Sequence, residues 1–223
     1  MSETMRIRLT FTEPLLGTAS ANAEIMEEFI ASKAATPEAT REEVEALPDA
    51  GEKLEKATTV FARTPDGRPC LWDYQVKGFF KDACGMLGRV GKPRKKEAKG
   101  ADAADEEASE SGFRSHQLRA YKKEIDGLIF PQPRQIPLIL PEGEEMGFCE
   151  RPLRAHTAQG ERVALARSEQ APVGTTVEFE VRMLRADLHL FVEEWLDYGR
   201  LRGFGQWRNS GMGRFTWREV PKA

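Results

Sequence analysis

The clearest pattern of apolar and polar residues lies near the start of the chain. Apolar residues occupy every second position from Met5 to Phe11, arginine and threonine fill the positions between them, and Pro14 follows closely. A period of two residues is that of a β-strand with one buried face. Proline cannot donate to a sheet ladder, so it ends the pattern. We therefore predict a strand over residues 5–12.

Two later segments carry the helical period instead. Large apolar residues recur three or four positions apart from Tyr74 to Leu87 and from Asp187 to Tyr198, and Asp73 can cap the first of these helices. The order β-α-β-β-α-β then predicts an α+β, ferredoxin-like (RRM-like) core, whose antiparallel sheet carries its helices on one face. The remaining core strands are expected at residues 162–168, 176–184 and 214–220.

Two segments fit no place in this core and are interpreted as insertions into a single domain that spans residues 1–223. Residues 22–56 have an acidic and helical composition. Residues 91–113 combine a basic run with a mixed-charge run, and because residues 91–112 hold no apolar side chain larger than alanine, this insertion is expected to be disordered. Shorter elements are expected as a hairpin of residues 58–63 and 69–72, a helix at 117–121, and strands at 128–130, 136–140 and 148–155.

The charge is unevenly distributed along the chain. There are 36 acidic and 33 basic residues, and the net charge of −3 weakly opposes nucleic-acid binding. However, residues 24–56 and 101–112 hold a large excess of acids, so the rest of the chain is basic, and arginine is frequent in its C-terminal half. A basic face on an acidic protein indicates a nucleic-acid ligand.

Composition also disfavours several other classes of protein. No run approaches the roughly 18 apolar residues of a membrane-spanning helix, and no apolar signal region precedes the first strand pattern. We therefore expect a cytoplasmic protein with no membrane partner. The three cysteines and three histidines are widely spaced, which predicts no disulfide framework, no metal site and no cofactor.

A glycine-rich loop is the strongest candidate for chemistry. Two Gly-x-Gly pairs, Gly203–Gly205 and Gly211–Gly213, are separated by five residues that include Trp207, Arg208 and Asn209. Glycine permits a positive φ and a close approach of the backbone to a ligand, while nearby arginines supply positive charge. The loop lies between a predicted helix and a predicted strand, so it is held at both ends. We predict that it binds a phosphate backbone.

Each candidate binding residue has an alternative reading. The lysines of the first helix either follow phosphates or form a solvated helix face, and the arginines near His156 either bind or face water. Trp207 either stacks on a base, a contact of ~1–3 kcal/mol, or anchors the loop in the core. Polar side chains at the crest of a glycine loop have few structural roles, which favours binding. The expected nucleic-acid-binding residues are Lys77, Lys81, Arg151, Arg154, Arg162, Arg202, Gly203, Gly205, Trp207, Arg208, Asn209, Gly211 and Gly213.

In four segments the chain resembles the RAMP superfamily of CRISPR-associated proteins, and most closely the backbone subunit of type III effector complexes. The segments are residues 14–19 after the first strand, 72–81 at the first helix, 157–181 at the central hairpin, and the glycine-rich loop 203–213. The resemblance implies a protein that binds single-stranded RNA, with single-stranded DNA as a second candidate. It also implies stacking on copies of itself or on other effector subunits.

The chain departs from the family where the family has catalytic residues. In type III backbone subunits an Asp in the loop after the first strand cuts target RNA, but residues 18–23 here read Thr-Ala-Ser-Ala-Asn-Ala. Other members process guide RNA with a His near the first helix, and the histidines of this chain are His116, His156 and His189. We therefore predict a non-catalytic protein. His156 is a weak catalytic candidate because it stands alone beside Thr157 and the chain has no pair of His-x-Thr motifs.

Two alternative functions stay open at this stage. One is a metal-independent RNA endonuclease of the same superfamily that uses His156. The other is an interaction protein, a phage or accessory component whose acidic segment 22–56 binds a protein partner. A solitary phage-type relative is as compatible with these insertions as a component of an antiviral complex.

Overall fold

A computed structural model describes residues 2–20, 58–90, 112–157 and 160–221, with only the backbone between 152 and 165. The strands are β1 (Glu3–Phe11), β2 (Leu15–Leu16), β3 (Ala19–Ser20), β4 (Thr58–Val60), β5 (Ala62–Arg63), β6 (Pro69–Trp72), β7 (Ile129–Gln132), β8 (Gln135–Ile139), β9 (Gly147–Thr157), β10 (Gly160–Ala171), β11 (Thr176–Met183) and β12 (Phe215–Glu219). The α-helices are α3 (Asp73–Val90), α4 (Tyr121–Leu128) and α5 (His189–Arg202), and short 3-10 helices are η1 (Arg114–Gln117), η2 (Ala186–Leu188) and η3 (Arg208–Ser210).

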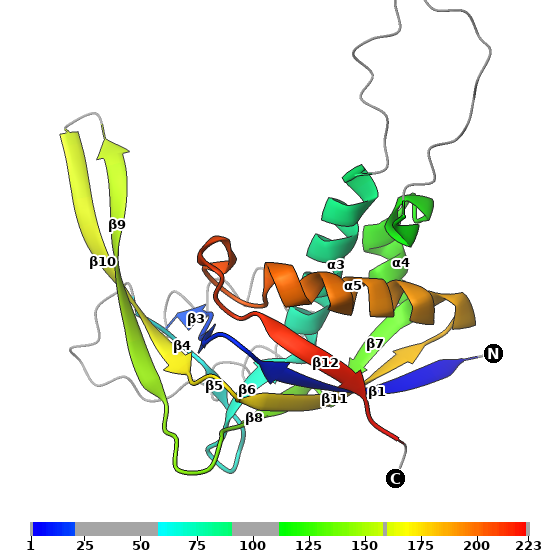
Figure 1. The fold of residues 1–223 in the computed structure, drawn as a ribbon, viewed down its shortest axis with the longest axis horizontal. Coiled ribbons are helices and arrows are strands. Elements are labelled where there is room, and N and C mark those ends of the chain that lie inside the picture. The colour runs from blue at the N-terminus through cyan, green and yellow to red at the C-terminus, as the bar shows by residue number, and fades with distance from the viewer. Residues whose placement is uncertain (1, 21–57, 91–111, 158–159, 222–223) are drawn as a thin grey trace, which may run out of the picture.

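The central sheet is built on β1. The apolar residues of this strand are buried, as the alternating pattern predicted, and its arginines lie on the opposite face. Strand β1 pairs antiparallel with β12 on one side and with β11 on the other. Helices α3, α4 and α5 lie together on one side of this sheet (Figure 1). On the other side Arg6 and Arg8 form ion pairs with Glu178 of β11.

The fold is ferredoxin-like, but the predicted second strand was wrong. The expected segment 162–168 lies in β10, which belongs to a different sheet. Its place in the core is taken by β7, which pairs antiparallel with β11. The order β12-β1-β11-β7 corresponds to strands 4-1-3-2 of a β-α-β-β-α-β unit. The long alternating run of β10 pairs over its whole length with β9, a partner that local periodicity cannot specify.

A second sheet flanks the first. Strand β10 pairs antiparallel with β9 and β2 and parallel with β4, which in turn pairs with β3. The long β9–β10 pair extends away from the rest of the molecule (Figure 1). The hairpin predicted from residues 58–63 and 69–72 is confirmed only in part. Strands β5 and β6 pair and join the central sheet through β8, whereas residues 58–60 form β4 of the second sheet. Strands β2 and β3, which follow β1 in the chain, therefore belong to the second sheet.

The predicted long helices are confirmed with extended ends. Helix α3 runs past the predicted residue 87 to Val90, and α5 continues to Arg202, where the glycine loop begins. The helix expected at 117–121 was wrong, because a turn there separates η1 from α4. Phe80 of α3 packs on Trp195 of α5, with ring centroids 5.4 Å apart, in the layer between helices and sheet.

The predicted insertions lie almost entirely outside the described residues. The acidic insertion 22–56 falls wholly outside them, as does 91–111 of the mixed-charge insertion. In the described ranges, no helix is long and apolar enough to cross a membrane.

Candidate nucleic-acid interface

The glycine-rich loop is closed at its base by its own backbone. The Phe204 N–H donates to Gly213 O over 2.8 Å, and the Gly213 N–H donates to Pro14 O over 2.8 Å. A Cβ added at Gly213 would lie 2.1 Å from Phe204 O, and one at Gly203 would lie 2.3 Å from Met212 O. The four predicted glycines all have positive φ values, between 69° and 86°. Glycine is required here for the tight closure of the loop.

The loop is also fixed to the body of the protein. Phe204 is buried, and its ring lies 5.5 Å from that of Phe79 in α3. A Cβ added at Gly205 would lie 3.2 Å from Leu15 Cδ1, in the segment after β1. The loop therefore packs on α3 through Phe204 and on β2 through Gly205.

Arg208 and Asn209, at the crest, have structural partners that the sequence did not indicate. Arg208 Nη1 donates to Asp82 Oδ2 of α3 over 2.6 Å, and Arg202 Nη1 donates to Asn209 Oδ1 over 2.8 Å. The expectation that such side chains have few structural roles was wrong. A guanidinium has five N–H donors, so the Asp82 contact orients Arg208 and leaves donors for a ligand.

Trp207 is not a core anchor. It is 39% exposed, and its φ of 53° makes it the single non-glycine residue with positive φ in the described part of the chain. The Arg151 guanidinium of β9 lies 4.9 Å from the Trp207 ring centroid and donates to Gln206 Oε1 over 3.0 Å. Such a backbone conformation is uncommon outside glycine and is found most often where function requires it.

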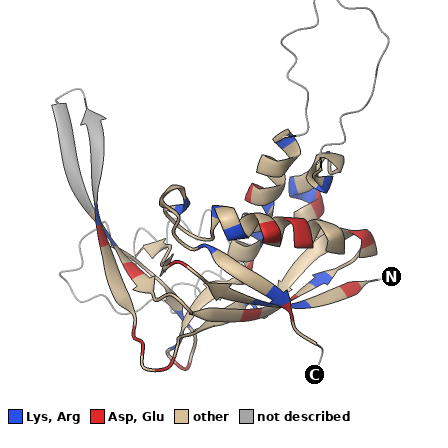
Figure 2. Cartoon of the chain, in the orientation of Figure 1, with Lys and Arg blue, Asp and Glu red and all other residues tan. Residues whose placement is uncertain are grey.

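Gln206 connects this crest to the second sheet. Its Nε2 donates to Gly17 O over 2.6 Å and to Thr59 Oγ1 over 3.1 Å. Arg151 Nη1 is buried and meets no hydrogen-bond partner among the described residues. The loop and β9 thus present a stacked Arg–Trp pair that Gln206 holds in place. Figure 2 shows basic residues at the crest and at the adjoining end of α5, with acidic residues farther along that helix.

A cavity of about 470 Å³ opens beside the loop, and the sequence reasoning missed it. Aromatic side chains line much of it, and Trp72 and Tyr74 stack with ring centroids 6.2 Å apart. Its walls come from β3, β4, β5, β6, α3 and the loop, six segments that only the fold brings together. The lining residues are Thr18, Ala19, Ser20, Thr59, Val60, Phe61, Ala62, Cys70, Trp72, Tyr74, Gln75, Gly78, Phe79, Phe204, Gly205 and Arg208.

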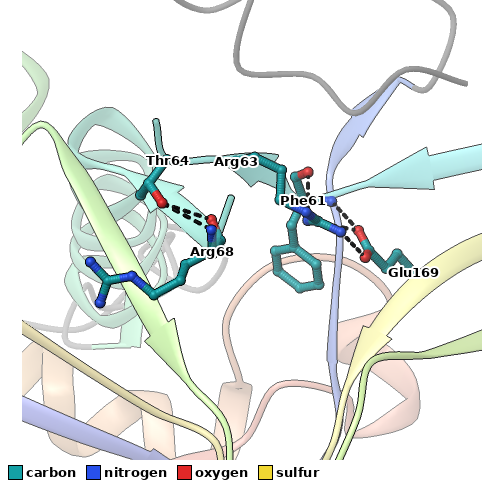
Figure 3. Close-up of polar contacts among 5 residues, drawn as sticks. All are labelled: Phe61, Arg63, Thr64, Arg68 and Glu169. Carbon is teal, nitrogen blue, oxygen red and sulfur yellow. Dashed lines mark hydrogen bonds and ion pairs between the residues drawn. The ribbon is translucent and has the colours of Figure 1, made fainter. Parts of the chain in front are cut away.

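A buried ion pair fixes one wall of this cavity. Glu169 of β10, only 5% exposed, accepts a hydrogen bond from the Phe61 N–H over 2.8 Å and pairs with both terminal nitrogens of Arg63 (Figure 3). Arg63 Nη1 also donates to Phe61 O over 3.0 Å. Next to it, the Thr64 hydroxyl and the Arg68 backbone bond to each other in the β5–β6 turn (Figure 3). The two sheets are therefore joined at Phe61.

The lysine candidates of α3 lie apart from the loop. Lys77 Nζ donates to Asp126 O over 3.2 Å and lies 4.6 Å from the Phe130 ring centroid. Burial lowers the pKa of Lys77, while the carboxylates of Asp126 and Asp73 act against this effect. Lys81 forms an ion pair with Asp126. Both lysines thus contact α4, Lys77 also contacts β7, and neither lines the cavity beside the loop.

The remaining candidates lie on the β9–β10 pair. Arg154 is opposite Val163, Arg162 is opposite Ala155, and His156 is opposite Glu161. Their side chains lie outside the described part of the structure. Across the described ranges, no group of three or more His, Cys, Asp or Glu residues is arranged to hold a metal ion.

Solved structures with a similar fold come from CRISPR effector complexes. One is a chain in the cryo-EM structure of the Type III-B Cmr-beta complex bound to cognate target RNA, with a TM-score of 0.50 and 11% sequence identity. The protein has the fold of a CRISPR effector subunit. This likeness confirms the predicted α+β, ferredoxin-like fold. The alignment covers 99% of this chain and 60% of that one, so the present chain spans well under two thirds of its length.

A second similar chain occurs in a Type IV-B CRISPR complex, with a TM-score of 0.47 and 13% identity over 99% of this chain and 92% of that chain. No protein-family model and no curated protein sequence matches the chain.

Proposed function

We propose that this protein binds single-stranded RNA through the crest of its glycine-rich loop and does not cleave it. The observation that carries the proposal is the half-exposed Trp207, held in a left-handed conformation with Arg151 stacked on its ring. An aromatic face stacks on any unpaired base, and a neighbouring guanidinium binds phosphate, so together they suit a single strand. Arg208 adds a second guanidinium at the same crest.

The proposed setting is a ribonucleoprotein effector complex, in which the chain contacts RNA together with copies of itself or with other subunits. The fold of a Type III-B Cmr-beta subunit supports this setting, because that complex is bound to its target RNA. The absence of Asp from residues 18–23, where type III backbone subunits carry a catalytic Asp, supports a binding role without cleavage.

The test is a salt-titrated binding assay by fluorescence anisotropy with labelled single-stranded RNA. The double variant Trp207→Ala/Arg208→Ala removes one stacking platform and one phosphate contact. We expect at least about tenfold weaker binding, since one stacked base contributes ~1–3 kcal/mol. The slope of log K against log salt concentration should also decrease in magnitude by about 0.7, the value for one phosphate contact on a single strand.

The matched control is Arg185→Ala. Arg185 is also paired with an aspartate, Asp187, but it precedes α5, whereas the loop follows that helix, about 20 Å away along its axis. This variant should bind RNA as the wild type does. Equal affinity and equal salt slope in the wild type and the double variant would overturn the assignment of the interface. Cleavage of the RNA in the presence of EDTA would overturn the proposal that the protein does not cleave RNA.

A further inference from the structure

The 470 Å³ cavity beside the loop has a composition suited to one kind of ligand. We propose that it holds one unpaired nucleobase of the strand whose phosphates contact the loop, an inference that rests on the proposed RNA binding. Its volume lies within the usual range for ligand pockets, about 300–1,000 Å³. Phe61, Phe79 and Phe204 line it with aromatic rings, and Trp72 adds an indole. Rings of this kind bind the flat faces of bases.

Gln75 supplies a fixed polar group in the wall of the cavity. The Gln75 side chain is held by the Trp72 N–H, which donates to its Oε1 over 2.8 Å, and its Nε2 donates to Thr18 Oγ1 over 2.5 Å. An amide nitrogen carries two hydrogens, so Gln75 has a further donor for an acceptor on a base. An apolar side chain of a protein ligand would form no hydrogen bond with this fixed amide.

Arg208 joins the cavity to the loop. Its side chain lines the cavity and at the same time forms the Asp82 ion pair at the crest. A guanidinium held in that position can contact a phosphate while the attached base enters the cavity. The phosphate contact and the base site therefore fall within the span of one nucleotide. This continuity favours a nucleic-acid base over a separate small molecule.

Gly78 is the residue that keeps the cavity open on the α3 side. It lies inside α3, where glycine is less favourable than alanine by about 1 kcal/mol. It lines the cavity, and a Cβ added there meets no described atom within 4 Å. A larger side chain at this position would enter the cavity without displacing the helix. The structure thus offers a substitution that fills the cavity and favours the helical conformation.

The test compares Gly78→Leu with Gly127→Leu. Gly127 lies in α4, and a Cβ there also meets no described atom within 4 Å, so the control makes the same chemical change outside the cavity. With labelled single-stranded RNA we expect Gly78→Leu to bind about tenfold more weakly, the effect of losing one stacked base, and Gly127→Leu to bind as the wild type does. Circular dichroism checks that both variants are folded.

A strand of the same length that lacks bases separates the cavity from the phosphate contacts. Wild type and Gly78→Leu should bind this abasic strand equally. Should Gly78→Leu bind RNA as tightly as the wild type, or bind the abasic strand more weakly as well, the base site is overturned while RNA binding by the loop stands. Should the wild type bind no RNA, the proposed function falls too. Tyr74→Ala, which alters a partly exposed wall, replaces Gly78→Leu if that variant is unfolded.

Discussion

Removal of one partner of the ion pair between Arg63 and Glu169 should destabilise the protein strongly, and Glu169→Ala is the perturbation that tests this. This substitution removes the acceptor of the Phe61 N–H and leaves Arg63 without its carboxylate. Breaking a fully buried pair costs about 3–5 kcal/mol, but the Arg63 side chain is 24% exposed, so water offsets part of this loss. We expect a decrease of about 3 kcal/mol in the free energy of unfolding.

Urea unfolding followed by far-UV circular dichroism and by tryptophan fluorescence measures this change. For a chain of 223 residues, about 3 kcal/mol corresponds to a decrease in Tm of roughly 6–12 °C. The matched control is Glu150→Ala, because Glu150 pairs with Arg167 across β9 and β10 with both side chains about half exposed. An exposed pair contributes at most about 1 kcal/mol.

A double variant tests whether the loss comes from the unpaired charge. Arg63→Met/Glu169→Leu replaces the pair by apolar side chains of similar size, and it should be more stable than Glu169→Ala alone. The reasoning would be refuted if Glu169→Ala and Glu150→Ala lowered the free energy of unfolding equally. It would also be refuted if the double variant were less stable than the single one.

Two further predictions follow from backbone geometry and from buried thiols. Gly213→Ala places a Cβ 2.1 Å from the Phe204 carbonyl oxygen at a residue with positive φ. In urea unfolding it should therefore lose more stability than Gly67→Ala, because Gly67 also has positive φ but no described atom lies within 4 Å of an added Cβ. Equal losses would contradict this. Burial raises the pKa of Cys70 and Cys84 to about 11, so at pH 8 a thiol reagent should modify the partly exposed Cys149 first. The free energy of unfolding should also decrease as the pH rises from about 9 to 11, because the folded state retains protons that the unfolded state releases. Rapid modification of all three thiols in the native protein, or a free energy of unfolding that is constant over that pH range, would show that burial does not protect the two.

Local periodicity was sufficient to predict the elements with one clear face. Strand β1 and helices α3 and α5 each bury a regular stripe of side chains, and that stripe is visible in the sequence. A strand was expected at 128–130, but its place in the core was missed because β7 is short and contains Pro131, whereas β10 has a long strand-like run. Strand pairing over a long sequence separation decides whether β7 or β10 enters the core, and local composition does not encode that pairing.

The candidate site shows the same division between local and distant information. The positive φ values of the loop glycines could be predicted, because glycine spacing is a local property. The ion pair between Arg208 and Asp82 joins residues 126 positions apart, and the walls of the cavity come from six segments. From the sequence, Trp207 was interpreted either as a base-stacking residue or as an anchor of the loop in the core. Its partial exposure and its contact with Arg151 decide against the core anchor.

The central claim is that RNA lies on the crest of the glycine-rich loop, and ultraviolet cross-linking tests it most directly. Trypsin releases residues 203–208 as one peptide, which contains Trp207. After irradiation of the wild-type protein with single-stranded RNA, mass spectrometry should find the nucleotide adduct on this peptide, and the adduct should disappear at high salt. Cross-links confined to residues 124–134, which carry Phe130 beside Lys77 on the α4–β7 side, would contradict the account.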